Sequence, residues 1–143
     1  MTYSMDYKKF DKKVFVRIDK GEEIIETLKQ ICKDLDIKAG TITGIGATDK
    51  AVIGLFDMKT KKYHSKELVG DHEIAPMYCN ISTMNSEVYL HLHITLGNSE
   101  HMSFAGHLTS AVVSATFEGV IDIIDGEIDR SFDVNTGLNL LKL

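Results

Sequence analysis

Three histidines are the residues of this sequence best suited to chemistry. His91 and His93 alternate with aliphatic residues in a run of β-type residues, so a strand there would place both imidazoles on one polar face. Their backbones would lie about 6.5 to 7 Å apart, a spacing from which both rings can bind one ion. Taken alone, such a pair is more often an exposed or hydrogen-bonded surface feature.

A third histidine strengthens the metal hypothesis. His107 follows Gly106, and a glycine there lets the backbone approach a neighbouring strand and direct the ring inward. The connection from Leu96 is short enough to keep this segment near the end of the strand that carries the first two histidines. Three neutral imidazoles would leave one position open on zinc, as in catalytic sites. We therefore predict a site for zinc or another divalent metal at His91, His93 and His107.

An enzymatic role is a second class of hypothesis. An open three-histidine metal would lower the pKa of bound water to about 7 and support a hydrolase or lyase reaction on a small molecule. Glu73 is the candidate acid or base if the fold brings it near, although an acidic residue before a strand is usually exposed. We expect the other histidines, His64, His72 and His101, to lie at the surface.

The charge of the chain argues against direct binding to nucleic acid. The formal net charge is −5, and affinity for phosphate comes almost wholly from lysine and arginine. The short lysine runs at 8–13 and 59–62 are typical of solvated surface. Because the N-terminus has no apolar leader and no stretch approaches about 18 apolar residues, we expect a cytoplasmic protein that does not enter membranes.

The apolar pattern predicts one helix and a series of strands. Apolar residues at helical spacing over 22–35 indicate an amphipathic helix with acidic residues at its start. Period-two patterns predict strands over 14–18, 41–45, 52–57, 63–69, 74–84, 88–96 and 111–124. The glycines of 43–47 lack the third glycine and the following helix of a nucleotide loop, so we interpret them as a bulge or close strand packing.

These elements predict an α+β fold, with a largely antiparallel sheet covered by one long N-terminal helix. The length of 143 residues suits a single domain over 1–143, with its core at about 7–125. Residues 130–143 contain four leucines and are too apolar for a free end. We expect this tail to dock on the core or on another subunit.

Four motifs in register resemble the plants-and-prokaryotes-conserved (PPC) domain, a domain of unknown function. The similarity covers about 7–125 and rests on Val16-Arg17-Ile18-Asp19-Lys20-Gly21-Glu22, Thr43-Gly44-Ile45-Gly46-Ala47, His91-Leu92-His93 and Gly106-His107-Leu108. The resemblance implies an α+β fold, a homotrimer and, in some prokaryotic members, a metal held by the three histidines. Ala105 stands where the family commonly has a further glycine.

The resemblance also raises a third class of function, a DNA-binding or transcription-associated protein. Plant members join this domain to a basic AT-hook that binds the minor groove of A·T-rich DNA. This chain has no Arg-Gly-Arg-Pro-like segment. Our leading hypothesis is a trimeric metal-binding module with its open site facing a cleft between subunits, where a small-molecule ligand would bind.

Overall fold

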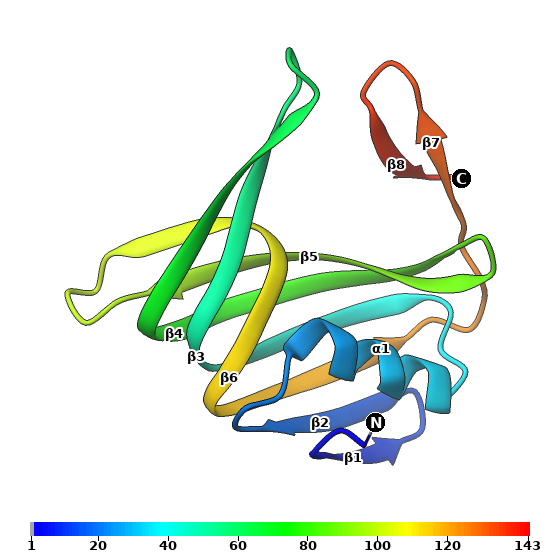
Figure 1. Ribbon diagram of the computed structural model, residues 1–143. Coiled ribbons are helices and arrows are strands. Elements are labelled where there is room, and N and C mark those ends of the chain that lie inside the picture. The colour runs from blue at the N-terminus through cyan, green and yellow to red at the C-terminus, as the bar shows by residue number, and fades with distance from the viewer. Residues whose placement is uncertain (1) are drawn as a thin grey trace.

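A strongly curved antiparallel sheet dominates the structure, a computed structural model that describes residues 2–143 (Figure 1). In chain order the elements are β1 (Met5–Phe10), β2 (Lys13–Asp19), α1 (Ile24–Asp34), β3 (Gly40–Asp57), β4 (Lys62–Met84), β5 (Glu87–Gly97), β6 (Ser103–Ile123), β7 (Arg130–Asp133) and β8 (Leu138–Leu141). Among the described residues no helix is long and apolar enough to cross a membrane.

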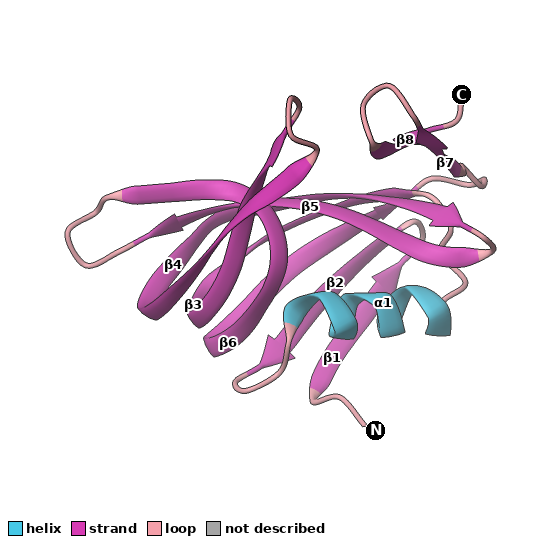
Figure 2. Cartoon of the chain, turned by 45° about the horizontal axis from the view of Figure 1, so that its top comes forward, coloured by secondary structure: helices cyan, strands magenta, loops and turns pink. Residues whose placement is uncertain are grey.

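The strands form one large sheet and one small hairpin. The six-stranded sheet has the order β1-β2-β6-β3-β4-β5, and β5 also pairs with β6, which closes four strands into a ring. The core lies inside this curve, where the side chains of alternate strand residues and the apolar side of α1 pack together. β7 and β8 pair only with each other and stand apart from the large sheet (Figure 2).

Two glycines allow β3 to lie close to β6. At Gly44 a Cβ atom would overlap the ring of Phe117, which is completely buried. At Gly46, where φ is +156° and a Cβ would overlap the backbone of Thr116, the β3–β4 register shifts. The interpretation of this glycine segment as a bulge with close strand packing is confirmed.

The helix is short and has well-defined ends. The Glu23 carboxylate accepts hydrogen bonds from the backbone N–H groups of Ile25 and Glu26, which satisfies donors that the first turn leaves free. α1 has 11 residues and ends at Asp34, with Leu35 as its C-cap, and Asp36 then has a φ of +52°. The left-handed conformation at Asp36 turns the chain toward β3.

The predicted α+β class with a long N-terminal helix is wrong. Residues 2–143 form a mostly antiparallel β structure with a single helix of three turns, and the β1–β2 hairpin precedes that helix. The amphipathic pattern located the helix correctly. A single short helix beside so many strands, however, does not justify an α+β fold class. The sequence analysis did not predict β1, because this edge strand has almost every residue exposed.

Several strands are longer than the sequence predicts. The predicted strands at 41–45 and 52–57 are one strand, β3, and those at 63–69 and 74–84 are one strand, β4. Register shifts interrupt the period-two pattern inside both strands, so one continuous strand has the pattern of two. β6 begins at Ser103, eight residues before the predicted start at Ala111.

The C-terminal tail forms the β7–β8 hairpin. Its approach to the large sheet is fixed by the Thr83 N–H, which donates to the carbonyl of Ile128 at 2.8 Å, and by the side chain of Arg130. Leu140, Leu141 and Leu143 remain exposed.

Candidate metal centre

Strand pairing brings the three predicted histidines together. β5 carries His91 and His93 on one face, and the β5–β6 register sets His107 directly opposite His93. One ring nitrogen from each histidine lies within 4.8 Å of the others. The ring centroids are 5.0 Å apart for His91 and His93, 5.5 Å for His91 and His107, and 5.8 Å for His93 and His107.

The predicted alternation along β5 is confirmed. Leu90, Leu92, Ile94 and Leu96 are buried in the core, while the histidines point to the opposite face. The aliphatic side chains therefore anchor the strand, and the polar face is free to hold a ligand.

A close approach of backbones positions His107. This residue pairs with Gly54 on β3 as well as with His93 on β5, so β6 lies between two strands at this point. A Cβ atom at Gly106 would lie 2.9 Å from the carbonyl oxygen of Gly54. The glycine before His107 is therefore required by packing, as the sequence predicts.

The electrostatics of the triad favour neutral imidazoles. Burial lowers the pKa of His91 to about 4, with further repulsion from His93, Arg130 and His107. Burial also lowers the pKa of His107, followed by the effect of His93. A metal binds the neutral form of histidine, so these two side chains are ready to coordinate at pH 7 without losing a proton.

The donor set fits a divalent ion of the zinc type. In a tetrahedral site with Zn–N bonds of about 2.0–2.1 Å, the nitrogens are about 3.3 Å apart. The ring nitrogens of the triad all lie within 4.8 Å of one another, which is close to this spacing. Three nitrogens would leave one position of the ion for an exogenous ligand.

A buried arginine lies beside the triad and was missed by the sequence analysis. The Arg130 guanidinium donates from Nε to Ser82 Oγ at 2.8 Å, from one terminal nitrogen to Asn80 Oδ1 at 2.7 Å and from the other to the Asn139 carbonyl at 2.8 Å. It also lies over the ring of Tyr89, 4.9 Å from the centroid. Arg130 is the first residue of the short strand β7, which follows the long strands, and no sequence pattern predicts its neighbours.

An aromatic residue of the β3–β4 hairpin contacts the triad from another side. The Tyr63 ring packs on His107 with 5.5 Å between centroids, and burial followed by the nearby Tyr89 raises the pKa of its phenol. The Lys61 ammonium of the same hairpin donates to the Asn135 carbonyl at 2.7 Å. This hydrogen bond links the β3–β4 hairpin to the β7–β8 turn, and both lie at the upper end of the molecule in Figure 1.

The structure does not bring Glu73 to the triad. Glu73 is exposed on β4 and pairs with Gly97, four residues beyond His93 on β5, or about 13 Å along the strand. The remaining histidines also lie elsewhere: His64 Nε2 is 3.2 Å from Asp57 Oδ2, His72 Nδ1 is 2.7 Å from the Gly70 carbonyl, and His101 is exposed in a turn.

The family model for the Plants and Prokaryotes Conserved (PCC) domain matches residues 5–125. The chain belongs to this family. The resemblance to this family that the sequence suggested is thus confirmed. No curated protein matches the chain.

Solved structures are similar to this PCC chain over nearly its whole length. A Bacteroides thetaiotaomicron protein described provisionally as DNA-binding is 39% identical, with a TM-score of 0.94 and 96% of each chain covered. A metal-containing protein from Archaeoglobus fulgidus is 31% identical, with a TM-score of 0.85, covering 100% of this chain and 99% of its own. A plant- and prokaryote-conserved protein from Pyrococcus horikoshii is 28% identical, with a TM-score of 0.85, covering 100% and 97%.

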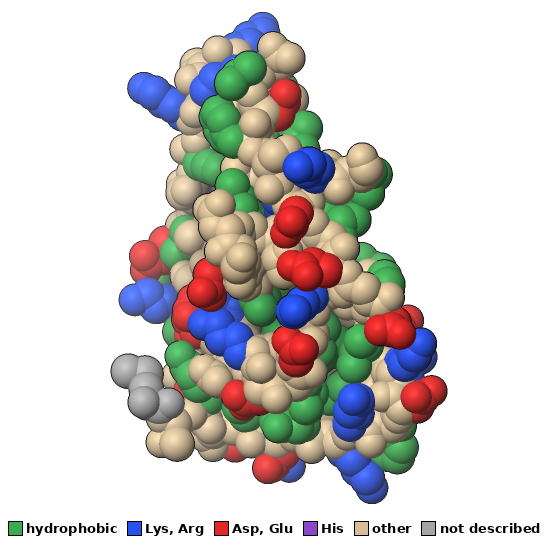
Figure 3. Space-filling view, turned by 90° about the vertical axis from the view of Figure 1, so that its right-hand side faces the viewer, with side chains coloured by type: hydrophobic (Ala, Val, Ile, Leu, Met, Phe, Trp, Pro, Cys, Tyr) green, Lys and Arg blue, Asp and Glu red, His purple; other side chains and the backbone are tan. Residues whose placement is uncertain are grey.

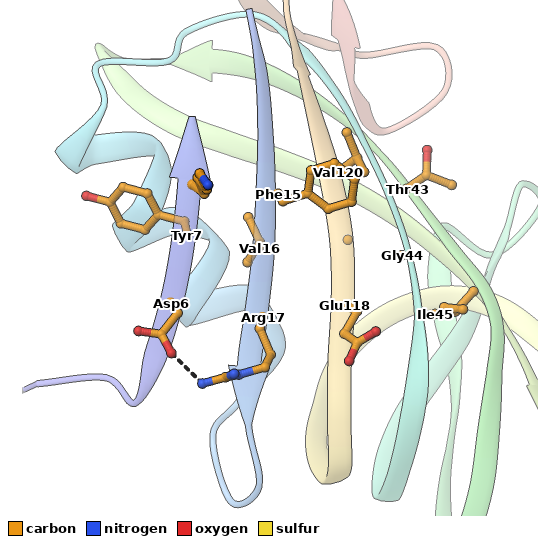
Figure 4. A pocket seen from close by; sticks show the side chains of 12 residues that line it. Asp6, Tyr7, Phe15, Val16, Arg17, Thr43, Gly44, Ile45, Glu118 and Val120 are labelled. Carbon is orange, nitrogen blue, oxygen red and sulfur yellow. Dashed lines mark hydrogen bonds and ion pairs between the residues drawn. The ribbon is translucent and has the colours of Figure 1, made fainter. Parts of the chain in front are cut away.

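A second surface feature of the PCC chain is an apolar hollow on the outer face of β1, β2, β6 and β3. It has a volume of about 540 Å³ and includes Phe15, Ile45 and Val120 (Figure 4). Phe15 is 59% exposed and Ile45 is 60% exposed. The ion pair between Arg17 and Asp6 lies at its edge.

Proposed function

We propose that this PCC-domain protein binds a divalent metal ion, zinc in the first instance, through His91, His93 and His107. The observation that carries the proposal is the convergence of three ring nitrogens within 4.8 Å of one another. The lowered pKa values of two of the rings support it, because they hold the neutral, metal-binding form. The relative described as metal-containing, 31% identical over its length, adds independent support.

A bound ion would supply Lewis acidity at the position that the three nitrogens leave open. The chain's own residues would limit what reaches that position: Tyr63 packs on one side of the triad, and Arg130 and Tyr89 lie on another. A metal-dependent hydrolase or lyase acting on a small molecule is the enzymatic form of this proposal.

The test is elemental analysis of the purified protein together with two variants. We expect near-stoichiometric zinc in the wild-type protein and its loss in His93→Ala, because two ligands hold zinc far more weakly than three. His93 is exposed, so its removal should leave the fold intact by circular dichroism. His64→Ala removes an exposed histidine outside the triad and should keep full zinc. Full zinc in His93→Ala would contradict the assignment.

We also propose that the protein is a homotrimer, with the metal site in a cleft between subunits. The apolar hollow supports an interface, because exposed aromatic and aliphatic side chains gather there. Direct cross-strand pairs run from Val120 to Thr43, from Thr43 to Tyr78 and from Tyr78 to His93. Opposed residues point to the same side of a sheet, so hollow and triad share one face that a single interface could cover.

Light scattering tests the assembly. We expect a particle of three times the 15.9 kDa mass of one chain, both with zinc and after its removal. A monomer at micromolar concentration would contradict the trimer without affecting the metal proposal.

DNA binding is the second candidate function. It is favoured by the 39% identical relative with a provisional DNA-binding description and by the basic tip of the β3–β4 hairpin, which carries Lys59, Lys61 and Lys62. Basic side chains gather at the upper end of the face drawn in Figure 3, but acidic and basic side chains mix across its middle. The net charge of −5 weighs against it.

A mobility shift on duplex DNA at several salt concentrations tests this candidate. If it is correct, affinity falls steeply with salt, and a Lys59→Gln, Lys61→Gln, Lys62→Gln triple variant lowers the salt slope by about three. Absence of any shift at about 50 mM salt would exclude it.

A further inference from the structure

Arg130 is a buried cation without an acidic partner among residues 2–143. The residue as a whole is only 9% exposed to solvent. The three groups that accept its hydrogen bonds, on Ser82, Asn80 and Asn139, are all neutral. None of the ion pairs of the described residues includes it.

A buried position is unfavourable for a guanidinium unless a bound anion neutralises its charge. Removing a charge from water without pairing it is among the largest single penalties in a protein interior. The ring of Tyr89 beneath the guanidinium offsets part of this penalty through a cation–π contact. Three of the five N–H donors are used by the contacts above, so two remain for a further acceptor.

The position of Arg130 relative to the triad indicates where a further acceptor would lie. Asn80, which holds one end of the guanidinium, is directly opposite His91 in the β4–β5 ladder. Tyr89, which lies under the guanidinium, precedes His91 by two residues on the same face of β5. Arg130 is therefore one step away from His91, on the face to which the three imidazoles point.

We propose that Arg130 is an anion-binding residue of the histidine site, and that the ligand of this site is a small molecule carrying a carboxylate or phosphate group. The anionic oxygens bind the free donors of Arg130, while another part of the ligand reaches the triad. Arginine suits this role because its planar fork matches both groups. The inference rests on the proposed function for the triad, and it adds the chemical class of the ligand.

A purely structural role is the competing explanation. Arg130 links β4 to the β7–β8 hairpin through Asn80, Ser82 and the Asn139 carbonyl, and three such bonds can hold a tail in place. A neutral glutamine or methionine would meet that need without the burial of a charge. The experiment must therefore separate anion affinity from folding and from metal content.

Calorimetric titration of two probes, inorganic phosphate and acetate, tests the proposal on the zinc-loaded and the metal-free protein. We expect at least one probe to bind both forms, and the zinc-loaded form more tightly. In Arg130→Gln the affinity should fall by about tenfold or more, because a charge-assisted pair is lost. Zinc content should stay at the wild-type level. The control Lys142→Gln removes a cation from the same end of the chain and should keep wild-type affinity.

A second variant decides the matter if Arg130→Gln fails to fold. Asn80→Asp keeps the shape of the side chain and supplies Arg130 with the carboxylate that it lacks, so anion affinity should fall by about tenfold or more while the hairpin stays docked. Thr95→Asp is the matched control, because it adds the same charge on the triad face beyond His93, on the side away from Arg130. It should change affinity by less than about threefold.

Three results would overturn the proposal. The first is wild-type anion affinity in Arg130→Gln or Asn80→Asp, and the second is loss of zinc in parallel with loss of anion binding in Arg130→Gln. The third is no binding of either probe to the zinc-loaded or the metal-free wild-type protein. Failure of the triad itself is distinguishable, since a protein that takes up no zinc can still show Arg130-dependent phosphate binding.

Discussion

His93 and His107 face each other directly across the β5–β6 ladder, although 13 residues separate them in the chain. This pairing exists only because β5 and β6 meet at the point where the sheet closes on itself. His107 is at the same time opposite Gly54 on β3, so the third potential ligand belongs to a strand with neighbours on both sides. The closure of the sheet therefore also brings the three histidines together.

Substitution of Gly106 by alanine should disturb the proposed metal site through the backbone. The new Cβ would lie 2.9 Å from the Gly54 carbonyl oxygen, so β6 must shift away from β3 and move His107 with it. We expect a loss of about 1–3 kcal/mol in the free energy of unfolding, as in other overpacked sites, and weaker zinc binding. Chemical denaturation and a zinc competition assay measure the two effects.

Gly97→Ala provides the control for this prediction. Nothing lies within 4 Å of a Cβ at Gly97, which is also on β5, so the same chemical change should leave zinc affinity unaltered. Equal zinc affinity in the Gly106→Ala variant would show that His107 does not depend on the close approach of β6 to β3.

The histidine cluster was predictable because it depends on local features. The period-two alternation around His91 fixes the face of the strand on which the rings lie. Gly106 indicates that the backbone before His107 comes close to a neighbouring strand. The short connection between the two segments leaves little choice of partner strand. The convergence of the three histidines therefore followed from residues within 17 positions of one another, from 91 to 107.

Arg130 and Tyr63 were not predictable for the opposite reason. Arg130 lies 39 positions beyond His91, at the start of the short strand β7, and its contacts depend on how the C-terminal hairpin lies against β4. Tyr63 reaches His107 only because β3 and β4 are single long strands that curve across the site. Register shifts within those strands interrupted the alternation, which is also why the sequence predicted shorter strands. The single-domain organisation and the cytoplasmic location stay predictions.

Leu92→Ala should separate stability from metal binding. Leu92 is 1% exposed and lies between the two histidines of β5, on the core face. Deleting a buried leucine costs about 2–5 kcal/mol, so urea denaturation should show a large loss of stability. The folded fraction should still bind zinc with wild-type stoichiometry, because the rings project from the other face. Loss of zinc by folded Leu92→Ala would mean that core packing controls the ring positions.

The stability of the metal-free protein should depend on His91 as the pH falls. The pKa of this imidazole is about 4, mainly because burial opposes its charge, whereas the reference value is 6.5. The unfolded chain therefore binds a proton more readily between these values, so the stability contributed by neutral His91 is complete above pH 6.5 and is lost toward pH 4. We expect the urea midpoint to decline across this window.

The contribution of His91 to that decline can be isolated with His91→Gln. This variant cannot take up the proton, so its urea midpoint should fall less steeply with pH than that of the wild-type protein. His64→Gln, a change at an exposed histidine outside the triad, should follow the wild-type curve. Parallel curves for His91→Gln and wild type would show that other groups account for the pH dependence.

Charge introduced into the apolar hollow should dissociate the proposed trimer. Phe15 and Ile45 are 59% and 60% exposed in one chain, and an interface over the hollow would bury both. A Phe15→Glu or Ile45→Glu variant would then bury an unpaired carboxylate, so we expect monomers in light scattering with an unchanged circular dichroism spectrum. Leu55→Glu is the control, since Leu55 is 70% exposed but lies outside the hollow. If Leu55→Glu alone dissociates the assembly, the subunits meet along the β3–β4 hairpin instead.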